Sequence, residues 1–273
     1  MHLTIALATR GRPELLRQTL NKTLRNIHQR TTKLVVLSDY DDETMARFGV
    51  DDLRVSVSRE VREDSLGEKF NRAIKIAPAD VYTYMVDYAP HVTPGFDTKI
   101  LEAAKLFPDG IGCVYGHMAN MSFPYMQAVT QKWVDLAGGM FPGYFPYWFV
   151  DHWLDDLARM TDRYAACDVQ VDVSARPGTQ EHREPGFWGT FYDAMRSERH
   201  DQANRIIDAM DEPEWRKAVL RSRFHLIDER SMMINSICRA MPATDPTTDA
   251  RYERIKARAI AKLREADLTW MAA

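Results

Sequence analysis

Short apolar runs alternate with helical spacing along the chain as far as residue 107. The apolar, β-rich runs are residues 3–8, 32–39 and 81–87, and residues 53–58 alternate between apolar and polar side chains, which predicts a further strand. Between and after them, apolar residues recur every three or four positions in 12–30, 66–77 and 95–107, and a short helix is expected just before Gly49. Apolar runs of this kind indicate strands that are buried on both faces. The pattern therefore predicts an α/β fold with a mostly parallel sheet flanked by helices.

The rest of the chain follows a different pattern. Residues 111–150 are rich in glycine and aromatic residues, which indicates a mixed extension of the sheet with loops around a cleft. Residues 167–175 are expected to form one more strand, and nearly everything beyond about residue 190 has helical spacing. We therefore predict a sheet-containing domain over residues 1–188 and a helical C-terminal extension over residues 189–273.

Composition narrows the class of protein. The chain has 273 residues, of which 45% are hydrophobic, and a formal net charge of −3, so no overall basic field points to nucleic acid. Its three cysteines are too few and too scattered for a disulfide framework. The apolar run at the N-terminus is too short for a signal peptide or an anchor, and no other run is long enough to span a bilayer. We expect a cytoplasmic protein.

Candidate chemistry lies where the predicted strands end. Ligands of open α/β sheets bind at the carboxyl ends of the strands. Thr9 and Arg10 follow the first strand, Asp39 ends the second and Asp87 ends the fourth. Either aspartate could instead be a helix cap or a turn former. The first turn, "ATRGRPE", lacks the glycines of a dinucleotide-binding loop, and the chain has no G-x-x-x-x-G-K-[ST] loop.

Several segments together resemble a known family. They are "ATRGRPE" after the first strand, "KLVVLSD" in the second, and "LGEKFNRAIKIAPADVYTYMVD" before the fourth strand ends. In their order and spacing they resemble GT-A fold glycosyltransferases of the family 2 type, although Ala8, Gly11, Lys69 and Ala73 depart from the pattern. The resemblance implies a GT-A fold and a binding site for a nucleotide-diphosphate sugar. It places that site at Ala8, Thr9, Arg10, Arg12, Asp39, Lys69, Asn71 and Asp87.

The resemblance also implies a metal site. "VDYAPHVTPGF" falls where the family has its D-x-D aspartates, but Asp87 is the only acid there. It would hold Mn²⁺ or Mg²⁺ together with the phosphates, and His182 would be a possible second ligand. His91 is nearer along the chain but less like the family. The missing second aspartate predicts weak metal binding, or metal-free catalysis with Arg10, Arg12 or Lys69 on the phosphates.

The segment from residue 129 to 160 resembles the acceptor side of the family. Asp151 would be the general base that takes the proton of the acceptor hydroxyl. We expect the aromatic loop before it to desolvate the carboxylate and raise its pKa. Asp151 could equally be a helix cap. Tyr144, Tyr147 or Trp148 could stack on the acceptor, or could simply belong to a small separate core.

The hypothesis is therefore a glycosyltransferase that moves a sugar, with inversion, from a nucleotide-diphosphate donor to a hydroxyl acceptor. The acceptor could be a saccharide, a lipid-linked glycan or a modified DNA base. The basic residues of 251–264 could bind DNA phosphates, or could lie on an amphipathic helix packed on its own domain. A nucleotidyltransferase on a related fold and an inactive sugar-nucleotide-binding relic remain open, and so does a retaining mechanism.

Overall fold

The computed structural model describes residues 1–88, 91–118, 124–172, 184–241 and 250–265. Its contacts divide the chain into two units. The first is Met1–Glu63, Glu68–Phe141 and Arg163–Pro177, and the second is Asp64–Gly67, Pro142–Asp162 and Gly178–Ala273. The domain boundary at residue 188 stays a prediction.

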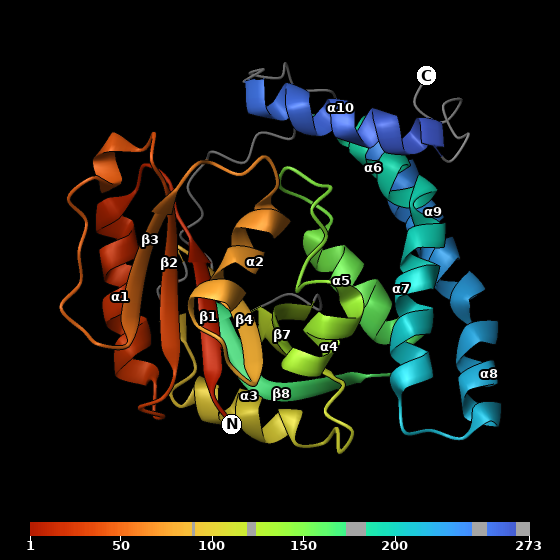
Figure 1. Cartoon of the computed structure of the whole chain (residues 1–273), viewed down its shortest axis with the longest axis horizontal. Helices are drawn as coiled ribbons and strands as arrows, with labels where there is room; N and C mark the ends of the chain where they lie inside the picture. The colour runs from red at the N-terminus through yellow and green to blue at the C-terminus, as the bar shows by residue number, and fades with distance from the viewer. Residues whose placement is uncertain (89–90, 119–123, 173–183, 242–249, 266–273) are drawn as a thin grey trace. The chain divides into compact units, whose positions relative to one another are not determined.

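The first unit contains the sheet (Figure 1). β1 (Leu3–Ala8) lies between β2 (Lys33–Asp39) and β4 (Val81–Val86) and is parallel to both, and β3 (Val55–Glu60) pairs in parallel with β2. The sheet continues through β7 (Pro124–Thr130), which is antiparallel to β4, then β6 (Cys113–Met118), β8 (Tyr164–Asp172) and β5 (His91–Val92). The predicted mixed, mostly parallel sheet is confirmed.

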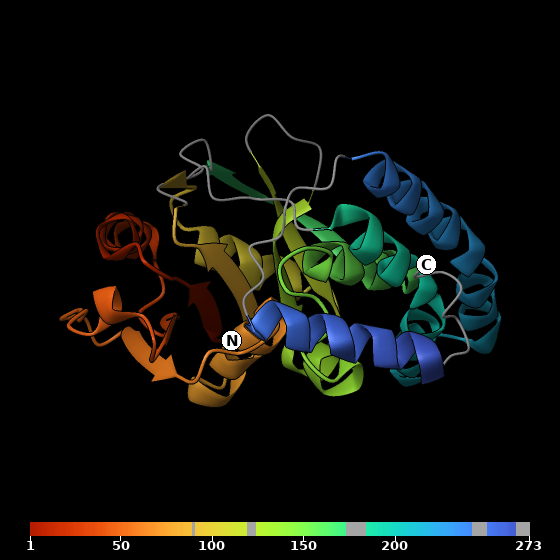
Figure 2. The ribbon, with the colours of Figure 1, turned by 90° about the horizontal axis from the view of Figure 1, so that it is seen from above.

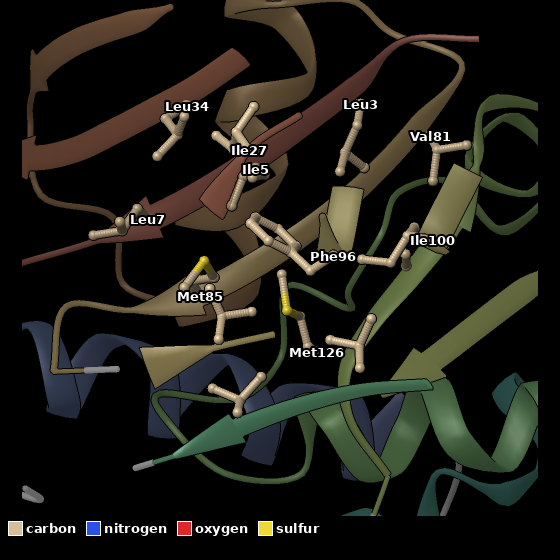
Figure 3. Close-up of a cluster of buried hydrophobic side chains, with 14 of the residues drawn as sticks. Leu3, Ile5, Leu7, Ile27, Leu34, Val81, Met85, Phe96, Ile100 and Met126 are labelled. Carbon is tan, nitrogen blue, oxygen red and sulfur yellow. The ribbon is translucent and has the colours of Figure 1, made fainter. Parts of the chain in front are cut away.

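Alternation along the strands sends side chains to both faces of this sheet. Leu3, Ile5 and Leu7 of β1 are fully buried in one hydrophobic cluster with side chains of α1 (Pro13–Asn26) and α3 (Phe96–Ala104), as Figure 3 shows for Phe96 and Ile100. On α2 (Leu66–Ile76), Phe70 packs against Tyr84 of β4 with ring centroids 5.3 Å apart. Burial of each large apolar side chain stabilises the fold by roughly 1.5–3 kcal/mol.

The helix predicted just before Gly49 is wrong in type and length. The structure has only a 3₁₀ turn at Glu43–Met45, labelled η1. The carboxylate of Asp42 accepts a hydrogen bond from the backbone N–H of Thr44 at 3.2 Å and from its hydroxyl at 2.6 Å, which caps this single turn. A side chain that bonds the nearby backbone competes with a longer helix.

The second unit is helical. Its elements are α5 (Val150–Met160), α6 (Pro185–Ala194), α7 (Arg196–Ala209), α8 (Glu214–Ser222), α9 (Phe224–Ala240) and α10 (Ala250–Glu265). The fully buried ring of Phe145 lies 5.5 Å from Phe191 and 6.0 Å from Trp153, centroid to centroid. The aromatic loop before α5 therefore forms part of the core of this unit. No helix in the described ranges is long and apolar enough to cross a membrane.

A buried ionic network crosses the helical core. Asp156 of α5 and Arg199 of α7 are both fully buried, and the Arg199 Nε lies 3.4 Å from an Asp156 oxygen. Asp156 also accepts a short hydrogen bond from the Tyr192 hydroxyl and pairs with Arg230 at 3.1 Å. Arg199 donates to the carbonyl oxygen of Tyr192 at 2.6 Å and to the Ser231 hydroxyl at 2.9 Å. Each buried charge thus has several partners, as a low-dielectric interior requires.

Most basic residues of α10, the blue helix of Figure 2, are paired within this unit. Arg254 binds Asp64 at 2.7 Å, and Lys256 binds Glu184 at 2.5 Å. On its apolar side, Tyr252 is fully buried and accepts a hydrogen bond from Trp188 Nε1 at 3.0 Å. The helix therefore packs on its own unit, and the charges that suggested DNA phosphates are matched by acids of the protein.

Candidate functional site

The turn after β1 brings arginine side chains to the carboxyl end of the sheet. Ala8 pairs with Leu37 of β2 and Val86 of β4, so the chain leaves the sheet between these two strands. Gly11 then adopts φ +70°, a left-handed conformation that favours glycine, and its N–H donates to Asp42 Oδ2 at 2.7 Å. Arg12 follows as the residue that precedes α1, and Pro13 starts the helix.

Asp39, at the end of β2, is surrounded by cations. It is 1% exposed, and Lys69 of α2 binds its Oδ1 at 2.6 Å. Arg10 binds Oδ2 at 3.1 Å, and the Nε of Arg62 lies 3.8 Å from the same oxygen. Because both oxygens face positive groups, the carboxylate holds these side chains together. The contact with the nucleotide sugar that the resemblance implies for Asp39 stays a prediction.

Asp87 follows β4 and is also buried, at 1% exposure. Its Oδ2 accepts a hydrogen bond from the Thr9 hydroxyl at 2.8 Å and lies 3.1 Å from the Nε of Arg12. Burial raises the pKa of Asp87, and the nearby Arg12 and Thr9 oppose that rise. The residues that follow the first strand and the aspartate that follows the fourth are therefore in contact, as expected. Asp87, however, is paired with Arg12.

A divalent cation does not fit the residues that the structure describes. In these ranges no three His, Cys, Asp or Glu side chains lie together as a metal-binding group. Asp87 already has Arg12 against its Oδ2, and a second cation there would be repelled by the guanidinium. His182, the second predicted ligand, lies outside the described residues, as does the side chain of His91. This geometry therefore disfavours the expected direct contact between Asp87 and a metal ion.

The side-chain amide of Asn71 is hydrogen-bonded to the protein backbone. Its Oδ1 accepts hydrogen bonds from the N–H groups of Met140 and Phe141 at 2.9 and 3.1 Å. Its Nδ2 donates to the carbonyl oxygen of Phe141 at 2.7 Å. Gly139 sits directly beside this amide, since a Cβ there would lie 2.7 Å from Nδ2. The amide therefore bonds the protein backbone, and a contact of Asn71 with the nucleotide sugar stays a prediction.

Replacement of Asn71 by Ala should lower the free energy of unfolding by about 1–3 kcal/mol, because buried backbone groups lose their partners. Asn71→Asp should cost less, since a carboxylate can still accept the two N–H bonds. Chemical denaturation measures both. Asn21→Ala, on an exposed position of α1, is the control. An Asn71→Ala protein as stable as the Asn21→Ala protein would refute the structural role.

Asp151 lies in the first turn of α5 in the second unit. Its Oδ1 accepts a hydrogen bond from the N–H of His152 at 2.9 Å and lies 3.1 Å from the Nδ1 of the same residue. Burial favours a raised pKa, but the His152 imidazole holds the pKa of Asp151 below its usual value. The expected rise is therefore wrong in sign, because the adjacent histidine outweighs desolvation.

The predicted acceptor residues belong to the same unit as Asp151. Tyr147 is half-buried, its hydroxyl accepts a short hydrogen bond from Arg251, and the guanidinium lies 5.1 Å from its ring centroid. Trp148 is also half-buried and makes an edge contact with Phe149 at 6.3 Å. Tyr147 is thus fixed by α10, and a role for either ring in acceptor binding stays a prediction.

Two arginines of the site were missed by reasoning from the sequence. Arg62 lies beside Asp39, and Arg72 pairs with Glu63 at 2.8 Å and donates to the Ser38 carbonyl oxygen at 3.1 Å. For Arg62 the signal was the charged run "REVRED", which begins in the last two residues of β3 and resembles any solvated loop, and Arg72 lies within α2. Whether such a run contributes to a site depends on which strand ends lie beside it in the fold, and the sequence of the run does not specify that.

No family model and no curated protein matches the sequence. Solved structures do match. A mannosyltransferase of Pyrobaculum calidifontis, in complex with GDP-Man and Mn²⁺, superposes with a TM-score of 0.50 at 16% identity, over 99% of this chain and 83% of that one. TarS 1–349 of S. aureus in complex with UDP-GlcNAc superposes with a TM-score of 0.58 at 13% identity, over 97% and 81% of the two chains. A further structure of TarS 1–349 gives a TM-score of 0.54. The chain has the GT-A-like glycosyltransferase fold that the sequence predicts.

Proposed function

We propose that this protein is a glycosyltransferase that uses a nucleoside-diphosphate sugar as donor and a hydroxyl group as acceptor. The observation that carries the proposal is the group of cations at the carboxyl ends of β1, β2 and β4. Arg10 and Lys69 form salt bridges with Asp39, and Arg12 forms one with Asp87. This is the edge of an α/β sheet at which ligands bind. A diphosphate is the kind of ligand that such a cluster suits.

The fold supports the same ligand class. The mannosyltransferase structure contains GDP-Man, and one of the TarS structures contains UDP-GlcNAc. At 16% and 13% identity, neither indicates which base or sugar this chain takes. In our proposal the donor phosphates lie against Arg10, Arg12 and Lys69, near Ala8 and Thr9 of the β1 turn.

Transfer needs one base and one stabilised leaving group. The acceptor oxygen attacks the anomeric carbon of the sugar, and its proton passes to the carboxylate of Asp151. The bond from the anomeric carbon to the diphosphate oxygen breaks, and its electron pair stays on the nucleoside diphosphate. Direct displacement of this kind inverts the anomeric centre. The Asp151 carboxylate is ionised, as a base must be, because its pKa lies below the usual value for aspartate; the same lowering makes it a weaker proton acceptor.

Calorimetric titration of the full chain with UDP-, GDP- and dTDP-sugars, with and without Mn²⁺, tests the donor half. We expect one nucleotide class to bind and to be slowly hydrolysed to the free diphosphate. The absence of binding across the whole panel would refute the proposal.

Three arms of the same experiment separate the rival functions. A relic would bind a donor without hydrolysing it. A nucleotidyltransferase would release pyrophosphate from a nucleoside triphosphate and a sugar phosphate. A DNA acceptor would show as duplex binding that weakens steeply with salt.

A further inference from the structure

Arg12 has one bound edge and one open edge. Its Nε lies 3.1 Å from Asp87 Oδ2, and its guanidinium carbon lies 5.7 Å from the centroid of the Tyr88 ring. The side chain is 30% exposed, and no described residue binds its two terminal nitrogens. Four N–H groups on those nitrogens are therefore available to a ligand.

Asp87 fixes the position of this arginine. The acid is held in turn, because the Thr9 hydroxyl donates to its Oδ2 at 2.8 Å and the Thr19 hydroxyl donates to its backbone carbonyl oxygen at 2.9 Å. The left-handed Gly11 and the proline that starts α1 set the backbone on either side of Arg12. A guanidinium held this way loses little side-chain entropy when it binds a ligand.

A second cation lies at the neighbouring strand end. The ammonium group of Lys69 is 3.5 Å from the carbonyl oxygen of Thr9 and 2.6 Å from Asp39. Thr9 therefore contacts both ion pairs. Its carbonyl oxygen contacts Lys69 of the Lys69–Asp39 pair, and its hydroxyl contacts Asp87 of the Arg12–Asp87 pair. A diphosphate carries at least two negative charges, and this pair of cations can stabilise both.

We propose that Arg12, positioned by Asp87, binds the donor diphosphate in the place where a divalent cation would otherwise stand, so that donor binding needs no metal. The inference rests on the proposed function. Asp87 is then a positioning residue rather than a metal ligand. A permanently charged arginine suits this task because it does not lose its proton as charge develops on the leaving phosphate oxygen.

The test is calorimetric titration of the metal-stripped full chain with UDP, GDP, dTDP and inorganic pyrophosphate, repeated with added Mn²⁺. Wild type should bind one of the three nucleotides without metal, and Mn²⁺ should change the affinity little. Arg12→Ala should weaken binding about 10- to 100-fold under both conditions, as loss of charge-assisted hydrogen bonds predicts. Arg12→Lys keeps the positive charge but loses the planar guanidinium, so its affinity should lie between those of wild type and Arg12→Ala.

Matched variants separate the possible failures. Arg17→Ala removes the same charge from an exposed position of α1, over the Phe48 ring, and should leave binding unchanged. Affinity that requires Mn²⁺, and that His182→Ala abolishes, would show that a metal holds the diphosphate and would overturn this inference alone. Wild-type affinity in Arg12→Ala would overturn it as well. If nothing binds under any condition, the proposed function fails with it.

Discussion

Replacing Asp151 with Asn should lower the turnover number about 10²- to 10⁴-fold, the usual contribution of a general base. Nucleotide affinity should stay the same, because the donor phosphate contacts that we propose come from Arg10, Arg12 and Lys69 and not from Asp151. Asparagine has nearly the same size and can still accept the hydrogen bond from the N–H of His152, so the helix start should survive. Release of nucleoside diphosphate in the presence of acceptor measures the rate.

A pH profile distinguishes a base from a helix cap. His152 holds the pKa of Asp151 down, so His152→Ala should raise that pKa and move the acidic limb of kcat/KM to higher pH. Asp156 and Arg230 also act on the His152 imidazole, and both remain in this variant. Asp201→Asn, at an exposed position of α7, is the control. If Asp151→Asn binds the donor and keeps the wild-type turnover number, Asp151 is a helix cap and not the general base.

Arg199→Leu should lower the free energy of unfolding by about 3–5 kcal/mol, because it leaves a buried carboxylate short of a partner. Asp156 would keep Arg230 and Tyr192 but lose the guanidinium that also stacks on the Tyr192 ring, 4.2 Å from its centroid. The Ser231 hydroxyl would lose a donor as well. Chemical denaturation of the purified protein measures the change.

Two comparisons make this result interpretable. Arg216→Ala breaks a solvent-exposed pair with Asp162 in the same unit, 3.1 Å apart, and should cost less than about 1 kcal/mol. Arg199→Lys keeps the charge and should be less damaging than Arg199→Leu, which allows measurement if the leucine variant does not fold. Equal costs for Arg199→Leu and Arg216→Ala would mean that the network contributes little.

The parts of the fold that follow from local pattern were predictable. Each of the apolar runs that become β1, β2 and β4 predicts a buried strand. The helical spacing of apolar residues in α1 and α3 predicts which face of each helix is buried. Parallel order then brings the ends of these strands together, which is why the sequence alone is enough to predict Arg10, Asp39 and Asp87 as neighbours.

What could not be predicted depends on partners distant in sequence. The helical pattern of the second unit runs on through Met195 and Arg223, yet a helix ends at each, without glycine or proline. Asn71 matched a family motif, but its amide is bound by the backbone of residues 140 and 141, seventy positions along the chain. The sign of the Asp151 pKa shift likewise followed from the side-chain direction of His152, which sequence does not specify.

The two units interleave along the polypeptide, and this limits how the protein can be rearranged. Residues 142–162 belong with the helices after 184, since Trp153 Nε1 donates to Gln202 at 2.8 Å and the Phe145 ring lies against Phe191. A chimera that took only its C-terminal helices from another protein of this fold would therefore remove the side chains against which α5 packs. An exchange that preserves folding must carry both segments as one block, even though a strand of the sheet lies between them in the gene.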